Sequence, residues 1–324
     1  MTLPTSITPA QPDTRLGPIY ALLAYSTWGL LPIYWKFFGA TSAVEVLSHR
    51  MIWSAVFLVG ILLVQRRLSD LTMLLRSPRK VLVLLLTASL LTFNWGLYIY
   101  GVNSDRVVEA SLGYYINPLV TVLLGFIFLK ERLYRGQQVA VALAVVGVGY
   151  FIWQLGTVPW IALSLAISFA FYGLLRKVVA VAPLAGLAVE TLLITPLVLL
   201  VVSWLAVSGQ GHFGESLPMT LLFIGAGVAT SMPLLWFNKA AKRLTLATLG
   251  FFQYLAPSLS LLLGVFVYGE PFTSVHVVTF SCIWAALLLY SVTAMRMRGR
   301  VGGLVGGSNT KSESHSPDSQ KAKP

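Results

Sequence analysis

The sequence predicts an all-α integral membrane protein with ten transmembrane helices, built as two inverted repeats of five helices each. Composition is the first of three observations behind this prediction. Of the 324 residues, 56% are hydrophobic and 10% are charged, whereas soluble domains are about 25% charged. The second observation is that apolar runs of about 20 residues, long enough to cross the hydrocarbon of a bilayer, recur from end to end. An internal duplication is the third.

The duplicated motif occupies residues 110–133, ASLGYYINPLVTVLLGFIFLKERL, and returns in altered form at 247–272. Both copies contain a proline inside an apolar helix, a glycine seven residues later and a glutamate six residues after that. These pairs lie 139 residues apart: Pro118 and Pro257, Gly125 and Gly264, Glu131 and Glu270. Solenoid repeats run about 20–50 residues, so this spacing indicates a duplicated multi-helix unit.

Ten helices are expected in chain order, with helices one to five in the first copy and six to ten in the second. The sequence WGLL in the first helix matches YGLL in the sixth, which extends the duplication beyond the motif above. The expected helices cover 18–36, 42–64, 81–101, 107–129, 137–154, 159–175, 184–207, 217–237, 244–268 and 274–294.

The two repeats are expected to occupy residues 17–155 and 156–294. The cytoplasmic segment 1–16 is polar and lacks the basic start, apolar stretch and cleavage site of a signal peptide, so the first helix is expected to be retained. The tail, 295–324, is rich in Gly, Ser and Lys. Because it cannot bury enough apolar surface to order itself, it is expected to be disordered.

Lys and Arg concentrate on one side of this topology. With the N-terminus inside, twenty of the 23 basic residues fall in inner segments and two, Lys36 and Arg106, fall in outer loops. The remaining one, Arg50, lies within the second helix. By the positive-inside rule, both termini are expected in the cytoplasm.

The charges that flank the duplicated motif indicate that its copies run in opposite directions. The first copy ends in KERLYR, with three basic residues, and the second ends in GEPF, with none. The preceding segments reverse this, with one basic residue in NSDR and three in NKAAKR. Inverted repeats are typical of secondary transporters, whose substrate site lies near the midplane between the repeats.

Several function classes lack their motifs. The single cysteine, Cys282, excludes a disulfide framework and a CxxC metal or redox site. The chain has no HExxH, no GxSxG and no P-loop, so neither hydrolytic chemistry nor ATP hydrolysis is expected. No metal, no cofactor and no enzymatic activity are therefore predicted.

The second helix carries the most informative polar residues. Its purely apolar part, 51–64, is only 14 residues long and too short to span a bilayer. The helix must therefore draw Glu45, His49 and Arg50 toward the membrane, where charges usually face a cavity or a partner. Arg50 is expected either to attract an anionic or polar substrate, or to snorkel outward or form a fixed structural pair. His49 could titrate near neutral pH.

Glu190 lies in the seventh helix, at nearly the position that His49 and Arg50 hold in the second. One interpretation makes it a proton carrier that interacts with Arg50 across the pseudo-axis, since buried carboxylates can serve in that role. The other makes it an interfacial carboxylate, because it follows the start of its helix by only about a turn and a half.

Neutral polar residues complete the predicted substrate path. Amides in lipid must find partners in neighbouring helices or in a ligand. Asn117 and Gln253 adjoin Pro118 and Pro257, where a missing N–H is expected to break the helix, and broken backbone is tolerated where it lines a cavity. A kink that only shapes the bundle is the competing account. The predicted path comprises His49, Arg50, Asn94, Trp95, Tyr114, Asn117, Tyr172, Glu190, Gln253 and Tyr254.

Two further groups of residues are expected to be structural. Glu131 and Glu270 end their helices and are expected to pair with, or cap, a neighbouring helix. Five tryptophans are expected to pack or to lie at the membrane interface rather than to bind ligand: Trp28, Trp35, Trp53, Trp160 and Trp204.

Seven motifs in matching order resemble the RarD branch of the EamA transporters, in the drug/metabolite transporter superfamily, over residues 17–294. The motifs are YSTWGLLPIYWK, SHRMIWS, FNWGLYIYGVN, EASLGYYINP, SFAFYGLLRK, ATLGFFQYLAP and YGE. The resemblance implies a ten-helix permease of the bacterial inner membrane, built from two EamA units and related to chloramphenicol sensitivity. Small four-helix members of the superfamily couple protons through a glutamate in their first helix. The first helix here has no acidic residue, so that role does not transfer.

The expected function is secondary-active transport of a small metabolite or drug-like molecule. The two repeats would rock around a central polar cavity, with an ion, protons being the candidate, as the coupled species. A membrane-embedded enzyme and a channel-like facilitator are the alternatives. Despite the net charge of +12, no nucleic-acid partner is expected. The expected partners are the substrate and the lipid bilayer, and both a monomer and a homodimer remain open.

Overall fold

The computed structural model describes residues 16–130, 133–179, 181–241, 243–244 and 252–309, and the regular structure within these ranges is helical. The all-α prediction is therefore confirmed for this part of the chain. The long helices are α1 (Leu16–Lys36), α2 (Ala43–Val64), α4 (Pro78–Asn103), α5 (Val107–Leu129), α6 (Arg135–Leu155), α7 (Trp160–Val179), α8 (Pro183–Val207), α9 (Leu217–Ala241) and α12 (Ser274–Asn309). The short ones are α3 (Leu68–Leu75), α11 (Leu255–Leu262) and the π-helix η1 (Leu263–Val267).

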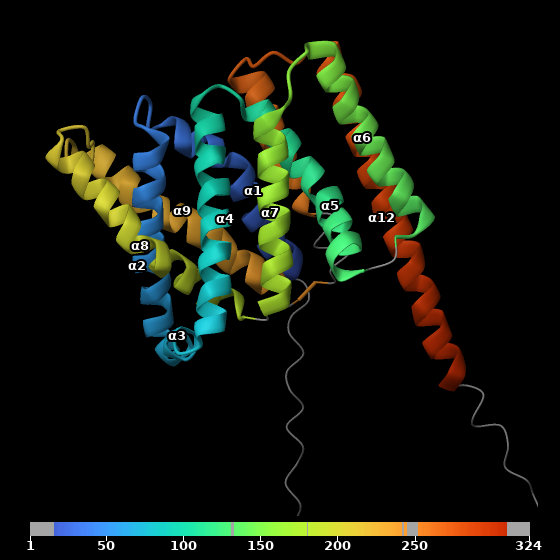
Figure 1. The fold of residues 1–324 in the computed structure, drawn as a ribbon, viewed down its shortest axis with the longest axis horizontal. Helices are drawn as coiled ribbons and strands as arrows, with labels where there is room; N and C mark the ends of the chain where they lie inside the picture. The colour runs from blue at the N-terminus through green and yellow to red at the C-terminus, as the bar shows by residue number, and fades with distance from the viewer. Residues whose placement is uncertain (1–15, 131–132, 180, 242, 245–251, 310–324) are drawn as a thin grey trace, which may run out of the picture.

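Eight of the described helices are long and apolar enough to cross a membrane. Two shorter apolar helices, in α7 and in α11 with η1, lie where the sixth and ninth crossings are expected. Connections gather at opposite ends of the bundle: Figure 1 shows those after α1, α4, α6 and α8 at one end and the short helix α3 at the other. The protein is thus a multi-pass membrane protein.

Two features of the described chain differ from the expected boundaries. The surface helix α3 was not expected, and it forms between the basic residues Arg67 and Arg76. Helix α12 continues to Asn309, past the expected end at residue 294 and into the tail that was expected to be disordered. Three predictions concern residues outside the described ranges: those for Glu131, for the start of the second motif copy at 247–251 and for the tail after residue 309.

The helices of the two expected repeats interlock. Helix α7, from the second repeat, packs on α4 and α5 of the first, and α1, from the first, packs on α9 and α11 of the second. We call these groups the α4 bundle (α4, α5 and α7) and the α1 bundle (α1, α9 and α11). Helices α2 and α8 pack on each other and link the bundles, through the α2–α9 and α4–α8 contacts, while α6 pairs with α12.

Glycines allow the closest helix approach inside each bundle. A Cβ atom added to Gly113 in α5 would lie 2.7 Å from the carbonyl oxygen of Ala162 in α7. A Cβ atom added to Gly29 in α1 would lie 2.8 Å from the carbonyl oxygen of Ala256 in α11. Small residues that let backbones approach are a main source of helix association in membranes, so each bundle is tightly joined.

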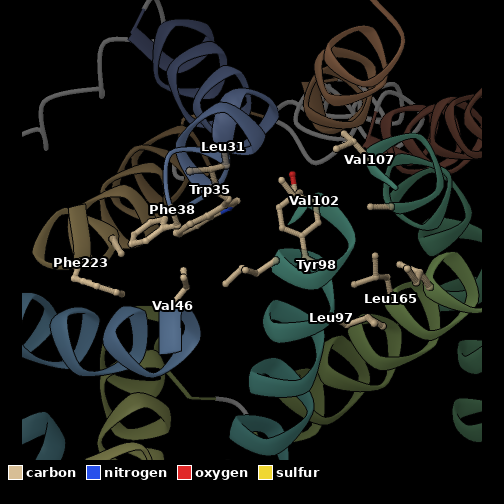
Figure 2. Close-up of a cluster of buried hydrophobic side chains, with 14 residues drawn as sticks. Leu31, Trp35, Phe38, Val46, Leu97, Tyr98, Val102, Val107, Leu165 and Phe223 are labelled. Atoms are coloured by element: carbon tan, nitrogen blue, oxygen red, sulfur yellow. The ribbon is translucent and has the colours of Figure 1, made fainter. Parts of the chain in front are cut away.

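A hydrophobic cluster joins the two bundles near the end that carries the α1–α2 connection. In Figure 2, Trp35 of α1 and Phe38, just after α1, lie beside Phe223 of α9, and Tyr98 and Val102 of α4 face them. The rings of Phe38 and Phe223 are 5.0 Å apart between centroids. Because the cluster contains buried residues from both bundles, the bundles are in contact at this end.

Glu270 caps the N-terminus of α5 from outside the helix. Its two carboxylate oxygens each accept a hydrogen bond, from the backbone N–H groups of Val107 and Val108, both at 2.7 Å. These N–H groups have no partner within the helix, and a negative charge is favourable at a helix N-terminus. The expectation that Glu270 caps a neighbouring helix is confirmed.

Candidate functional site

Arg50 is a buried cation in the first half of α2. Its side chain comes from α2 and the residue is 4% exposed, so it does not snorkel to the surface. The guanidinium lies against two indole rings, with its carbon 4.0 Å from the ring centroid of Trp95 in α4 and 4.9 Å from that of Trp35 in α1. Its Nε and Nη1 atoms are buried and have no hydrogen-bond partner within the part of the chain that the structure describes.

Two tyrosines complete the surroundings of Arg50. Tyr98 of α4 and Tyr114 of α5 are its electrostatic neighbours, and their rings meet edge to face at 5.5 Å between centroids. We call Arg50, Trp35, Trp95, Tyr98 and Tyr114 the arginine cluster. Three predicted path residues, Arg50, Trp95 and Tyr114, therefore come together.

His49 points away from the arginine cluster. Its ring stacks on Phe213, at 4.6 Å between centroids, and lies 4.3 Å from the ring of Phe223. It is 3% exposed, and no described residue forms a hydrogen bond with its Nε2 atom. The loop that carries Phe213 therefore covers His49 and the start of α2.

Glu45 fastens this loop to α2. The carboxylate is 1% exposed, and it accepts a hydrogen bond of 2.6 Å from the backbone N–H of His212. The ring Nδ1 of His212 lies 2.8 Å from the other carboxylate oxygen. This hydrogen bond raises the pKa of His212, with Glu215 in the same loop adding a smaller effect in the same direction.

The contact between Glu45 and His212 is expected to depend on pH. Because the folded-state pKa is raised, the contact stabilises the closed loop fully below the unfolded pKa of about 6.5 and loses that contribution as pH rises through the folded value. Replacing Glu45 with glutamine is expected to return the His212 pKa toward its ordinary value. NMR titration of the His212 ring measures this, with His212→Gln assigning the signal. An unchanged pKa in Glu45→Gln would contradict the assigned cause.

Glu190 lies in a second buried cluster. Its carboxylate is fully buried in α8 and accepts a 2.7 Å hydrogen bond from the hydroxyl of Thr87 in α4. The hydroxyl of Tyr172 in α7 donates a longer bond of 3.4 Å, and Nη1 of Arg176 lies 3.5 Å from the carboxylate. We call Glu190, Thr87, Tyr172 and Arg176 the glutamate cluster.

The partner of Glu190 differs from the hypothesis of an Arg50–Glu190 interaction. In the described ranges, its ion pair is with Arg176, while the neighbours of Arg50 are aromatic. Arg176 reaches Glu190 because Gly186 leaves room for it: a Cβ atom added to that glycine would lie 2.0 Å from Nη1 of Arg176. The two charges that sequence analysis considered together thus occupy separate clusters.

Two predicted amides bind the backbone of α7. Nδ2 of Asn94 donates to the carbonyl oxygen of Leu165 and to the hydroxyl of Ser168, both at 2.9 Å. Nδ2 of Asn117 donates to the carbonyl oxygen of Ala166 at 3.0 Å. In this conformation both amides join helices of the α4 bundle. Of the two expected partners, a neighbouring helix and a ligand, they therefore bind the neighbouring helix.

The repeated prolines differ in their effect on the described helices. Helix α5 is continuous through Pro118. Near Pro257 the helix is interrupted at Tyr254, just after Gln253, and it passes into the π-helix η1 beyond residue 262. A missing N–H removes one hydrogen bond, which an intact helix tolerates where neighbouring helices support it.

Tyr254 lies at a separate cavity of about 340 Å³ between α5, α11 and α12. Its ring stacks on that of Tyr115 at 6.5 Å between centroids, and Tyr115 and Ser258 hydroxyls meet at 2.5 Å. Tyr254 is therefore remote from the arginine cluster. The cavity is lined by Tyr115, Tyr254, Ser258, Trp284, Leu287, Leu288 and Ser291.

Sequence reasoning missed several members of these clusters. Trp35 was assigned to packing, and it is indeed fully buried, but its ring also covers Arg50. Arg176 was counted only as a basic residue of an inner loop. Thr87 had a weak signal, as a hydroxyl within the apolar run LLLTASLL. Within the described ranges, no three His, Cys, Asp or Glu side chains gather as metal ligands would.

Comparison with known proteins places the chain in a family. Residues 15–153 match the EamA-like transporter family. The chain is 47% identical to an uncharacterized transporter of Vibrio cholerae, over 90% of this chain and 96% of that protein. It is 48% identical to the protein RarD of Salmonella typhi, over 87% of this chain and 97% of that protein.

A solved structure shares the fold. It is titled only as a crystal structure of a protein, and it superimposes with a TM-score of 0.57 at 20% identity, covering 86% of this chain and 98% of the other. At this identity the likeness concerns the fold alone. The extent and identity of the sequence matches show that the chain belongs to the EamA-like transporter family, among the RarD proteins, and is a membrane transporter of the drug/metabolite superfamily.

Proposed function

We propose that the protein is a secondary-active permease that moves a small metabolite or drug-like molecule across the bacterial inner membrane by alternating access. Its ten crossings form two inverted repeats of five helices. A membrane-embedded enzyme or a channel-like facilitator is the alternative that the experiment below distinguishes.

The observation that carries this proposal is the symmetric pairing of the helices. In the expected repeat, α1 corresponds to α7, α4 to α9, and α5 to α11. In the α4 bundle, α7 contacts α4 and α5. If each of these helices is replaced by its counterpart in the other repeat, the same contacts become those of α1 with α9 and α11, which are the contacts of the α1 bundle. The α2–α8 and α6–α12 pairs map onto themselves. Such exchange is expected for two repeats related by an axis in the membrane plane.

The basic residues support an orientation. The end with α3 carries Arg66, Arg67 and Arg76, whereas the connections at the opposite end carry Lys36 and Arg106. Lys36 pairs there with Asp105, and Arg106 pairs with Glu109. By the positive-inside rule, the α3 end faces the cytoplasm, as do both termini.

The interlocked packing supports a particular form of rocking. Each repeat contributes helices to both bundles, so the repeats cannot move apart as separate bodies. The moving bodies are instead the α4 bundle and the α1 bundle, each held together at its close helix contacts at Gly113 and Gly29. The hydrophobic cluster that contains Phe38 and Phe223 joins the bundles at the end that carries the α1–α2 connection, so rocking would have to separate residues of this cluster.

Glu190 is the candidate proton carrier. It is fully buried and contacts the α4 bundle through Thr87 and Tyr172. Its carboxylate would alternate between a protonated form and a charged form that is paired with Arg176. Undiminished proton-dependent flux in Glu190→Gln would remove this role while leaving the transport proposal intact.

Reconstituted vesicles test the function. Purified protein in liposomes loaded with a bacterial metabolite extract is given an imposed pH gradient, and solutes on both sides are followed by mass spectrometry. We expect at least one solute to accumulate against its gradient, and to stop doing so when a protonophore collapses the pH difference. Equilibration without saturation would identify a channel, and chemical conversion of a solute would identify an enzyme. Protein-free liposomes are the control.

A further inference from the structure

We propose that Arg50 is the anion-binding group of the substrate site and that the substrate is a small organic monocarboxylate with a planar apolar body. The inference rests on the proposed transport function and adds the chemical class of the cargo. It depends on the state of one side chain, on the geometry around it and on the place of that side chain between the two bundles.

Arg50 is a charge without a counter-charge. It is 4% exposed, and in the described part of the chain no carboxylate forms an ion pair with it. Two of its guanidinium nitrogens, Nε and Nη1, are buried and have no hydrogen-bond partner among the described residues. Buried charges in membrane proteins are costly and are normally paired. A site that leaves such a charge unpaired is suited to a ligand that supplies the missing charge.

The rings around Arg50 determine which ligand atoms can reach it. The indole rings of Trp95 and Trp35 lie against the guanidinium, with its carbon 4.0 Å and 4.9 Å from their centroids, so aromatic surface covers part of the group. The in-plane N–H groups remain for a ligand. A planar carboxylate accepts two parallel hydrogen bonds from such an edge. The indole Nε1 of Trp35 is also buried, has no hydrogen-bond partner in the described ranges, and is a further donor close to Arg50.

The charge balance favours a monoanion. The electrostatic neighbours of Arg50 are the neutral phenols Tyr98 and Tyr114, so the cluster holds a single positive charge. One guanidinium balances one carboxylate, whereas a phosphate dianion would remain partly uncompensated in a medium of low dielectric constant. The aromatic walls provide apolar surface for the rest of the ligand, which favours a flat hydrocarbon body.

The arginine cluster lies between the proposed moving bodies. Trp35 belongs to the α1 bundle, whereas Trp95, Tyr98 and Tyr114 belong to the α4 bundle, and Arg50 comes from the linking helix α2. A carboxylate on Arg50 would contact both bundles. Rocking of one bundle against the other would then change the surroundings of the bound ligand, as alternating access requires.

Ligand binding to the full-length protein in detergent tests the inference without requiring transport. The probes are benzoate, its neutral analogue benzamide and its cationic analogue benzylamine. Binding is followed by intrinsic tryptophan fluorescence, because Trp35 and Trp95 border the site, and by the shift in melting temperature. We expect saturable binding of benzoate and at least about tenfold weaker binding of both analogues, a factor that corresponds to about 1.4 kcal/mol.

Variants assign the binding to Arg50. Arg50→Gln is expected to weaken benzoate binding at least about tenfold and to abolish the preference over benzamide. Arg50→Lys keeps the charge but not the planar pair of donors, so it is expected to retain a smaller preference. It also keeps the test decisive if Arg50→Gln does not fold. The matched control is Arg67→Gln, which removes an arginine that pairs with Asp70 at the surface.

Three outcomes would overturn the inference: no saturable benzoate binding, equal binding of benzoate and benzamide, or unchanged benzoate binding in the Arg50 variants. Carboxylate binding in a protein that moves no solute in vesicles would instead contradict the proposed function. The two failures are therefore distinguishable.

Discussion

Replacing Glu190 with alanine is expected to lower the free energy of unfolding by about 3–5 kcal/mol, because it leaves Arg176 buried without a counter-charge. The carboxylate is fully buried and the Arg176 side chain is 14% exposed. The hydroxyl of Thr87 would also lose its 2.7 Å acceptor. Unfolding of the purified protein by SDS in mixed lipid micelles, followed by circular dichroism, measures the change.

Two comparisons separate the charge effect from lost packing. Glu190→Gln keeps an acceptor for Thr87 and a side chain of the same size, so we expect a smaller loss than in Glu190→Ala. The double variant Glu190→Leu with Arg176→Met removes both charges and is expected to recover much of the stability, since apolar replacements of a buried ion pair are often neutral. A double variant as unstable as Glu190→Ala would show that the pair itself is not responsible.

Replacing Gly227 with alanine is expected to destabilise the contact between α2 and α9 by about 1–3 kcal/mol, the usual cost of overpacking. A Cβ atom there would lie 2.4 Å from the backbone carbonyl carbon of Trp53 and 2.6 Å from its oxygen. Backbone atoms cannot move aside as the tip of a side chain can, so the two helices would have to separate. The same unfolding assay measures the loss.

Gly149 provides the matched control for this substitution. It lies in α6, and a Cβ atom added to it would meet nothing within 4 Å. Alanine there is expected to be neutral or to stabilise by up to about 1 kcal/mol, because alanine is the better helix former. Equal losses at Gly227 and Gly149 would mean that helix propensity or general expression, rather than the close contact with Trp53, determines the effect.

The fold could be predicted from sequence to the extent that it depends on local properties. An apolar run must be long enough to cross a bilayer and must satisfy its own backbone, so length and composition suffice to predict a helix. The capping role of Glu270 was foreseeable for a similar reason, since a carboxylate just past a membrane helix has helix N-termini within reach. The interruption near Pro257 had a local signal as well.

The site could be predicted only in part. Arg50, Trp95 and Tyr114 were all in the predicted path, because charge and aromatic polarity inside apolar helices are unusual enough to be noticed. The partner of Glu190 was left open between Arg50 and an interfacial position. The residue that pairs with it, Arg176, was not recognised, because in the sequence it resembles any other basic residue at a helix end. The sequence allowed either a ligand or a neighbouring helix as the partner of Asn94 and Asn117, and in this conformation both side chains bind α7.

By itself, the sequence determined that the chain is a helical multi-pass membrane protein with an internal duplication, because hydrophobic length and repeated motifs are properties of the chain in order. The tertiary structure alone decided that helices from the two halves of the chain pack in two mixed bundles, that Arg50 lies against two indole rings and that Glu190 pairs with Arg176. Helices in a membrane are apolar on nearly every side, so their sequences do not specify which face meets which neighbour. Close backbone approach at small residues such as Gly29 and Gly113 makes that choice.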